Sequence, residues 1–176
     1  MKRVEFKKYV FRKYSANFPQ LFKKERNKLK KILIKGARIE HVGSTAVKGL
    51  GGKGIIDILI SVNKPKVKEN KKILQKAGYL FNSSGSSKQR KFFMKEYASK
   101  NNVRRVHLHL TFHNSFESRR ALSFVKYLRA HPDKIKEYAK IKEKAIKYAK
   151  GQGEKYREYK NKLLEKLGKE ALKEFC

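Results

Sequence analysis

Residues 55–62 read IIDILISV, and this nearly continuous apolar run is the feature that most constrains the fold. A strand that is apolar at consecutive positions is expected to be buried on both faces of its sheet. Asp57 is the one acidic side chain in the run, and a lone carboxylate there is costly unless it is paired or bound to a metal. The strand therefore predicts a covered sheet and a special environment for Asp57.

Apolar spacing along the rest of the chain predicts helices and strands on either side of this run. A helix is expected over residues 15–33, with Pro19 in its opening turn, and a short helix is expected after Pro65. Further strands are expected at residues 38–42, 79–81, 90–97 and 103–112. Three amphipathic helices with lysine on their outer faces are expected from about residue 115 to residue 176. The predicted class is α+β: a mixed sheet with flanking helices and a helical C-terminal third, in one domain over residues 1–176.

The chain is strongly basic, with 47 Lys and Arg against 15 Asp and Glu and a formal net charge of +32. Such a field attracts phosphate-bearing polymers or anionic lipid surfaces. Because the basic residues are spread along the whole chain, a lysine-rich proteome explains them equally well. RNA or another polyanion is therefore a candidate partner that the charge alone does not identify.

Cysteine content and hydropathy indicate the cellular location to expect for the protein. Cys176 is the single cysteine and forms no disulfide within the chain, which suits a reduced, cytoplasmic location. No apolar run is long enough for a transmembrane helix, so no membrane span is expected.

A loop rich in small residues, GSTAVKGLGGKG, precedes the Asp57 strand at residues 43–54. A Gly-Ser pair at the end of a strand lets the backbone approach a phosphate, with Ser44 or Thr45 donating to its oxygens. A carboxylate facing such a loop could hold Mg²⁺ against the phosphates of a nucleotide. The structural alternative is an Asp57 that accepts hydrogen bonds from loop amides, with the glycines present for turns. The residue types leave both interpretations open.

The spacing from Gly43-Ser44 to Asp57 resembles the signature of the DNA polymerase β nucleotidyltransferase superfamily. More specifically, IEHVGSTAVKGLGGKGIIDILI at residues 39–60 resembles the GrpB family within that superfamily. The resemblance covers nearly the whole chain and implies a nucleotidyltransferase-type fold and metal-dependent transfer of a nucleotide monophosphate. Its other parts are Tyr14, Phe18-Pro19, Phe22, Glu25, Gly78-Tyr79, the HLH at residues 107–109 and residues 122–142.

The sequence departs from the expected pattern at three positions. Lys48 and Gly54 stand where the family usually has proline, which would loosen the loop. Polymerase-type transferases carry a second acid two residues after the first, and Leu59 occupies that position here. A standard two-metal mechanism needs more ligands than this strand supplies.

Four residues are candidates to replace the missing ligand: Glu40, His41, His107 and His109. His107 and His109 are two residues apart and so lie on one face of a strand. Glu40 and His41 are adjacent, so only one of them is expected to face the site. Imidazole ligands favour Zn²⁺, Mn²⁺ or another transition metal over Mg²⁺. The alternative for each histidine is a polar side chain that contacts phosphate or substrate.

Several cations are candidates for phosphate contacts. Lys53 lies in the loop before the Asp57 strand and can act as a point charge, and Arg90 and Arg129 are placed to do the same. The alternative for each is an ordinary solvated side chain. His113 and His131 have little to recommend them as ligands, and the lysine faces of the last three helices are expected to be solvated.

Two functions remain. The first is a nucleotidyltransferase that moves a nucleotide monophosphate onto RNA, a protein or a small acceptor, with Asp57 and a divalent metal (Mg²⁺ or Mn²⁺, or Zn²⁺) at its centre. His107 or His109 would act as ligand or base, and Gly43, Ser44, Thr45, Lys53 and Arg90 would bind the nucleotide. The second is a degenerate transferase that only binds nucleotide, RNA or a coenzyme A-related ligand. The resemblance supports the last ligand, because GrpB-like domains also occur joined to dephospho-CoA kinases.

Overall fold

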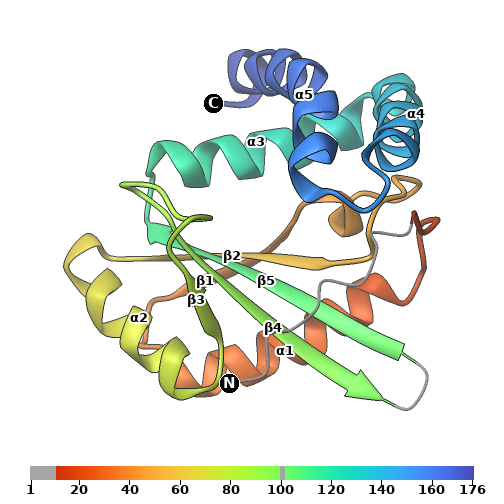
Figure 1. Ribbon diagram of the computed structural model, residues 1–176. Helices are drawn as coiled ribbons and strands as arrows, with labels where there is room; N and C mark the ends of the chain where they lie inside the picture. Colours follow the sequence, from red (N-terminus) through yellow and green to blue (C-terminus); the bar gives the residue numbers. More distant parts are fainter. Residues whose placement is uncertain (1–10, 100–101) are drawn as a thin grey trace.

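A five-stranded mixed sheet lies at the centre of the computed structural model, which describes residues 11–99 and 102–176 (Figure 1). The strand order is β1-β2-β5-β4-β3. β2 and β5 pair in parallel, and the other neighbours pair antiparallel. The strands are β1 (Arg38–Val42), β2 (Ile56–Val62), β3 (Leu80–Asn82), β4 (Lys91–Ser99) and β5 (Asn102–Phe112). The predicted α+β class with a mixed sheet is confirmed.

Helices cover both faces of this sheet (Figure 1). One face packs against α1 (Phe18–Ile32) and α2 (Val67–Lys76), and the other lies under α3 (Phe116–Ala130), α4 (Pro132–Ala149) and α5 (Gly153–Phe175). Two short 3₁₀ turns, η1 (Ser44–Ala46) and η2 (Lys64–Lys66), follow β1 and β2. The last three helices occupy the part of the chain predicted to be helical.

Strand β2 contributes to two separate hydrophobic clusters, which explains its continuous apolar sequence. Ile56, Ile58, Ile60 and Val62 pack with helices α1 and α2. Leu59 points the other way and packs with Leu128 of α3 and Leu167 of α5. Side chains of a strand alternate between faces, so Asp57 lies on the face covered by α3, α4 and α5. The predicted burial of β2 on both faces is confirmed.

Element boundaries differ from the predictions by a few residues. Helix α1 begins at Phe18 rather than at residue 15 and has proline in its first turn. β4 and β5 continue to a Ser99–Asn102 pair, beyond their predicted ends. Backbone hydrogen bonds extend this ribbon past the last large apolar residue of β4, Tyr97, so the hydrophobic pattern underestimates its length. Among the described residues, no helix is long and apolar enough to cross a membrane.

Candidate functional site

The centre of the candidate site is Asp57, in β2, which lies between β1 and β5 in the sheet. Asp57 pairs with His107 across the parallel β2–β5 ladder, and His109 follows on the same face of β5. His109 Nε2 lies 3.2 Å from Asp57 Oδ1, and His107 Nδ1 lies 3.5 Å from the same oxygen. The Asp57 side chain is 24% exposed, so a ligand can reach it. The structure thus brings the three predicted catalytic residues together.

The histidines keep Asp57 ionised. Burial alone would raise the pKa of this carboxyl group, but hydrogen bonds from His107 and His109 outweigh that effect and hold the pKa of Asp57 well below its ordinary value. The Phe92 ring packs against both imidazoles, with ring centroids 4.9 Å and 5.3 Å away. Each imidazole presents one nitrogen to Asp57.

Gly43 lies directly against the Asp57 carboxylate. Its φ is +71°, a conformation that glycine adopts without strain. A Cβ at this position would lie 2.6 Å from Asp57 Oδ2, so no larger residue fits. The Gly-Ser loop and the acidic strand are thus in contact, which gives a physical reason for their spacing in the sequence.

Thr45 has a different environment from the one expected. Its side chain donates to the Ile55 carbonyl at 3.1 Å and lies 2.9 Å from His41 Nε2. Because a hydroxyl has one proton, His41 Nε2 is the donor in the second contact. The Thr45 hydroxyl proton therefore braces the loop and is not directed at a phosphate.

The two candidate ligands on β1 lie on opposite faces of the sheet. His41 pairs with Ile58 and stacks on Phe22 of α1, with ring centroids 4.6 Å apart. Burial lowers the pKa of His41 to about 4, so it is neutral near pH 7. Glu40 pairs with Leu59 and so shares the face of Asp57. Strand alternation therefore separates His41 from the face on which the predicted metal site lies.

A set of partly buried lysines surrounds this region, and we name Lys53, Lys142 and Lys160 the lysine cluster. Lys142 of α4 is 4% exposed, and its Nζ donates to the Gly51 carbonyl at 2.7 Å. Lys53 and Lys160 place their Nζ atoms 4.6 Å and 5.5 Å from the centre of the Tyr156 ring. Three elements thus contribute cations next to the glycine-rich loop.

Burial, followed by repulsion from Lys160, lowers the pKa of Lys142 to about 7 and that of Lys53 to about 8. Burial also lowers the pKa of Lys160, and the charge of Asp57 acts in the opposite direction on all three. The prediction that lysines of the last three helices are solvated is wrong for Lys142. The sequence held a signal, because Tyr138, Lys142, Ala145 and Ala149 share one helical face.

The remaining candidate cations have structural contacts. Arg90 Nη2 donates to the Gly85 carbonyl at 3.0 Å, and its Nη1 lies 3.8 Å from Glu117. Arg90 directly precedes β4, and Phe92, two residues later, is the β4 residue opposite His109. Arg129 donates to the Ala46 carbonyl at 2.7 Å and holds the loop after Ser44 in place. His113 lies 3.1 Å from Ser61, and His131 lies 3.0 Å from Glu174.

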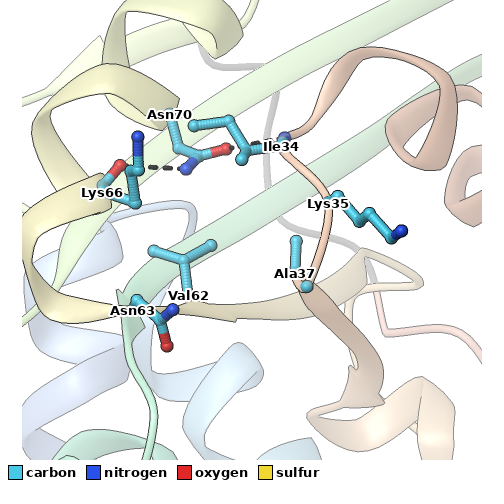
Figure 2. A pocket seen from close by; sticks show the side chains of 8 residues that line it. Ile34, Lys35, Ala37, Val62, Asn63, Lys66 and Asn70 are labelled. Carbon is cyan, nitrogen blue, oxygen red and sulfur yellow. Dashed lines mark hydrogen bonds between the residues drawn. The ribbon is translucent and has the colours of Figure 1, made fainter.

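Two hollows lie beside other parts of the fold. Figure 2 shows the smaller, about 20 Å³, where Asn70 bridges the Lys66 carbonyl and the Ile34 amide. That volume has room for about one water molecule. The larger, about 510 Å³, is shallow and lies between residues 11–14, the outer side of the glycine-rich loop and α4. Asp57 and the two histidines line neither of these two hollows.

The donor set around Asp57 limits the kind of metal site available. Among residues 11–99 and 102–176, no group of three or more His, Cys, Asp or Glu side chains is arranged to hold a metal ion. Leu59, in place of a second acid, is buried in the core. In nucleotide-handling sites Mg²⁺ commonly takes one or two carboxylates together with the substrate's phosphates. Asp57 fits a cation that arrives with a nucleotide, and does not fit an all-protein metal site.

Fold and site together define an α+β protein in which a strand carboxylate faces a Gly-Ser loop. The pattern of the family described as GrpB protein matches residues 9–170, and the chain belongs to the GrpB family. The glutamate-rich protein GrpB of Alkalihalophilus pseudofirmus is 35% identical over 133 residues, which are 73% of this chain and 76% of that protein.

The crystal structure of conserved protein GrpB from Enterococcus faecalis matches with a TM-score of 0.79 and 29% identity, over 94% of this chain and 99% of that one. The Cid1 poly(U) polymerase matches with a TM-score of 0.44 and 15% identity, over 74% of this chain and 45% of that one. The similarity to Cid1 is too distant to support an inference about this chain. The resemblance to the GrpB family is confirmed.

Proposed function

We propose that this protein binds a nucleotide and transfers its nucleoside monophosphate to an acceptor hydroxyl group. The observation that carries the proposal is the contact between Gly43 and Asp57, with His107 and His109 on the other carboxylate oxygen. A phosphate bound by the Gly-Ser loop would lie beside an ionised carboxylate and two imidazoles. Position and electrostatics are the main contributions that a protein makes to phosphoryl-type transfer.

In the proposed reaction the acceptor oxygen attacks the α-phosphorus of a nucleoside triphosphate. The new O–P bond forms while the bond from the α-phosphorus to the bridging oxygen breaks, and pyrophosphate leaves with that electron pair. His109 takes the proton of the acceptor: its Nε2–H donates to Asp57, which leaves Nδ1 free as the base. The carboxylate orients the ring and stabilises the imidazolium that forms.

The nucleotide would enter as its Mg²⁺ or Mn²⁺ complex, with Asp57 as the protein's carboxylate ligand. The cation would neutralise charge on the phosphates. Zn²⁺ is the other candidate, because His107 and His109 supply nitrogen donors. The protein's own groups orient the phosphates and accept the proton.

Charge and exposed aromatic rings favour RNA as the acceptor. Tyr148 of α4 and Tyr159 of α5 are 57% and 41% exposed, with ring centroids 5.2 Å apart. Lys144, Lys155 and Lys162 lie one helical turn from these rings. Aromatic rings flanked by cations are typical of single-strand binding surfaces.

Oligonucleotide binding tests this acceptor. Affinity for fluorescent RNA should fall steeply with salt and depend little on sequence, because phosphate contacts dominate. An affinity that does not change with salt, or no binding at low salt, would make the net charge of +32 a matter of proteome composition.

A non-catalytic binding module is the second candidate, and Leu59 favours it. Leu59 stands where the second acid of a polymerase-type site would be, and it packs in the core beneath α3 and α5. A protein that lost this ligand could retain binding of nucleotide, RNA or a coenzyme A-related molecule without turnover.

Transfer of label decides between the two. The protein is incubated with each nucleoside triphosphate labelled at the α-phosphate, with Mg²⁺, Mn²⁺ or Zn²⁺, and with RNA, protein or small acceptors. Labelled product should form with the wild type and with Glu143→Gln, a surface control, but not with Asp57→Asn or His109→Asn. Nucleotide binding without product would support the binding module, and absence of both would refute both functions.

A further inference from the structure

The ammonium group of Lys142 and the hydroxyl of Ser44 meet across Gly52. A Cβ at Gly52 would lie 2.6 Å from Lys142 Nζ and 2.8 Å from Ser44 Oγ. A larger residue would have to displace one of these polar groups, which approach the backbone from different elements. Helix α4 therefore delivers a cation to the loop whose first residue, Gly43, contacts Asp57.

Lys142 is placed at a high energetic cost. An ammonium group has three N–H donors, and one of them is used by the Gly51 carbonyl. Among residues 11–99 and 102–176, neither Lys142 nor Lys160 forms an ion pair. A buried charge without a close partner is strongly unfavourable unless a ligand compensates it.

The charge balance of the cluster indicates the sign of that ligand. Asp57 attracts Lys53, Lys142 and Lys160, while the lysines repel one another. Within the described part of the chain, Asp57 is the one carboxylate that acts on both Lys142 and Lys160, which leaves an excess of positive charge in a partly dehydrated place. A group with several negative charges would relieve this excess, and a single phosphate would relieve it less.

We propose that Lys142, Lys160 and Lys53, together with Ser44, bind the diphosphate part of the substrate. The subsite rests on the proposed function, since it lies next to the place assigned to the α-phosphate and would hold the departing pyrophosphate. It restricts the substrate to molecules with at least two linked phosphates, such as a nucleoside triphosphate or a coenzyme A-type molecule. The C-terminal helices thereby become part of the substrate site.

Proton uptake provides one signature of this subsite. An anion beside Lys142 favours its charged form, so binding should take up protons above about pH 7, where the free side chain is losing its charge. The groups that face this ammonium are Lys53, Lys160, Asp57 and the Tyr138 ring. Affinity for pyrophosphate should therefore fall as the pH rises from about 7 to about 9.

Calorimetry of the full chain without metal tests the proposal, with phosphate, pyrophosphate, AMP, ATP, dephospho-CoA and coenzyme A as ligands. Lys142→Met and Lys160→Met keep much of the side-chain volume and remove the charge. Lys147→Met is the matched control on α4, because the side chain of Lys147 is 76% exposed. Unfolding curves establish that each variant is folded.

Pyrophosphate should bind about tenfold or more tightly than phosphate, and ATP more tightly than AMP, as expected for charge-assisted hydrogen bonds. Lys142→Met and Lys160→Met should each weaken the binding of pyrophosphate by about tenfold or more. Lys147→Met should weaken it by less than about twofold. If coenzyme A binds more tightly than ATP, the diphosphate recognised by this subsite belongs to a coenzyme A-type molecule and not to a nucleoside triphosphate. Equal affinity for AMP and ATP, or unchanged binding by folded Lys142→Met, would overturn the subsite.

The outcomes separate this proposal from the proposed function. If pyrophosphate binding depends on Lys142 but no label is transferred under any condition, the diphosphate subsite is supported and the transferase function is refuted. Transfer that proceeds normally in Lys142→Met and Lys160→Met removes the subsite and leaves the transferase.

Discussion

Two carboxylates on opposite faces of the sheet have very different surroundings. Glu25 of α1 is fully buried, and its Oε1 accepts hydrogen bonds from Tyr79 at 2.6 Å and Tyr97 at 2.7 Å. Arg104 lies 3.7 Å from its other oxygen. Asp57 is partly exposed, and its nearest partners are two imidazoles.

The partners determine the role of each acid. Burial and the hydrogen bond to Glu25 raise the pKa of Tyr97 to about 12 and that of Tyr79 further, so both phenols remain donors. Glu25 is therefore held by fixed donors and has no room for a ligand. The partners of Asp57 are histidines and, farther away, lysines, which can turn toward a substrate. A carboxylate in the core is thus no sign of function until its partners are known.

The largest expected effect is on stability, at Glu25. Glu25→Ala should lower the free energy of unfolding by about 3–5 kcal/mol, because it strands Arg104 and two buried hydroxyls. Glu25→Gln should cost less, since its amide oxygen still accepts. Urea unfolding measures both. If Glu25→Ala lowers the free energy of unfolding no more than Asp57→Asn does, the two carboxylates do not differ in structural role.

Asp57→Asn should have a large effect on function and a smaller effect on stability. We expect transfer and metal-dependent nucleotide binding to fall by about a hundredfold or more, since the carboxylate is the centre of the site. The free energy of unfolding should fall by no more than about 1–3 kcal/mol, since an amide oxygen can still accept from His109. Thermal unfolding and calorimetry with and without Mn²⁺ and nucleotide measure the two effects. Metal-free destabilisation with unaltered nucleotide binding would make Asp57 a structural residue like Glu25.

Two glycines allow a sharper test of the loop contact. Gly43→Ala adds backbone strain at a φ of +71° and a Cβ that meets the Asp57 carboxylate. Gly36→Ala adds comparable strain at a φ of +94°, with no atom within 4 Å. Gly36→Ala should lose about 1–2 kcal/mol of stability, since it forces a non-glycine residue into a left-handed conformation, and Gly43→Ala should lose more, because its Cβ also meets the carboxylate. Only Gly43→Ala should also lose transfer activity; equal activity of the two would show that the contact is not needed.

The effect expected to be smallest at neutral pH is a pH dependence of stability that comes from His41. Its pKa falls from the ordinary 6.5 to about 4 because the ring is buried, so the unfolded chain binds the proton more readily. His41 should contribute full stability above about pH 6.5, and this contribution should decrease as the pH falls toward 4. Urea unfolding between these values should show a flatter dependence in His41→Asn than in the wild type. The same slope in both proteins would exclude His41 as its source.

Much of the fold was predictable from local patterns. β1 lies at the predicted residues 38–42, and β2 begins one residue later than predicted. The contact between Asp57 and the histidines was also predictable, because strand alternation places His107 and His109 on one face. The same rule separates Glu40 from His41, but does not tell which of the two shares the face of Asp57.

The sequence by itself determined the strand periods, the turn at Gly43 and the residue types available to the site. These are local properties, since they depend on backbone conformation and neighbouring side chains. Only the tertiary structure decided that Lys142 and Lys160 lie beside the loop and that Arg90 contacts Gly85 and Glu117. The reason is physical: helices α3, α4 and α5 are positioned by packing Leu128, Tyr138 and Leu167 on the sheet. That packing is non-local, so helical spacing can place Lys142 on an apolar face but does not show which part of the fold that face meets.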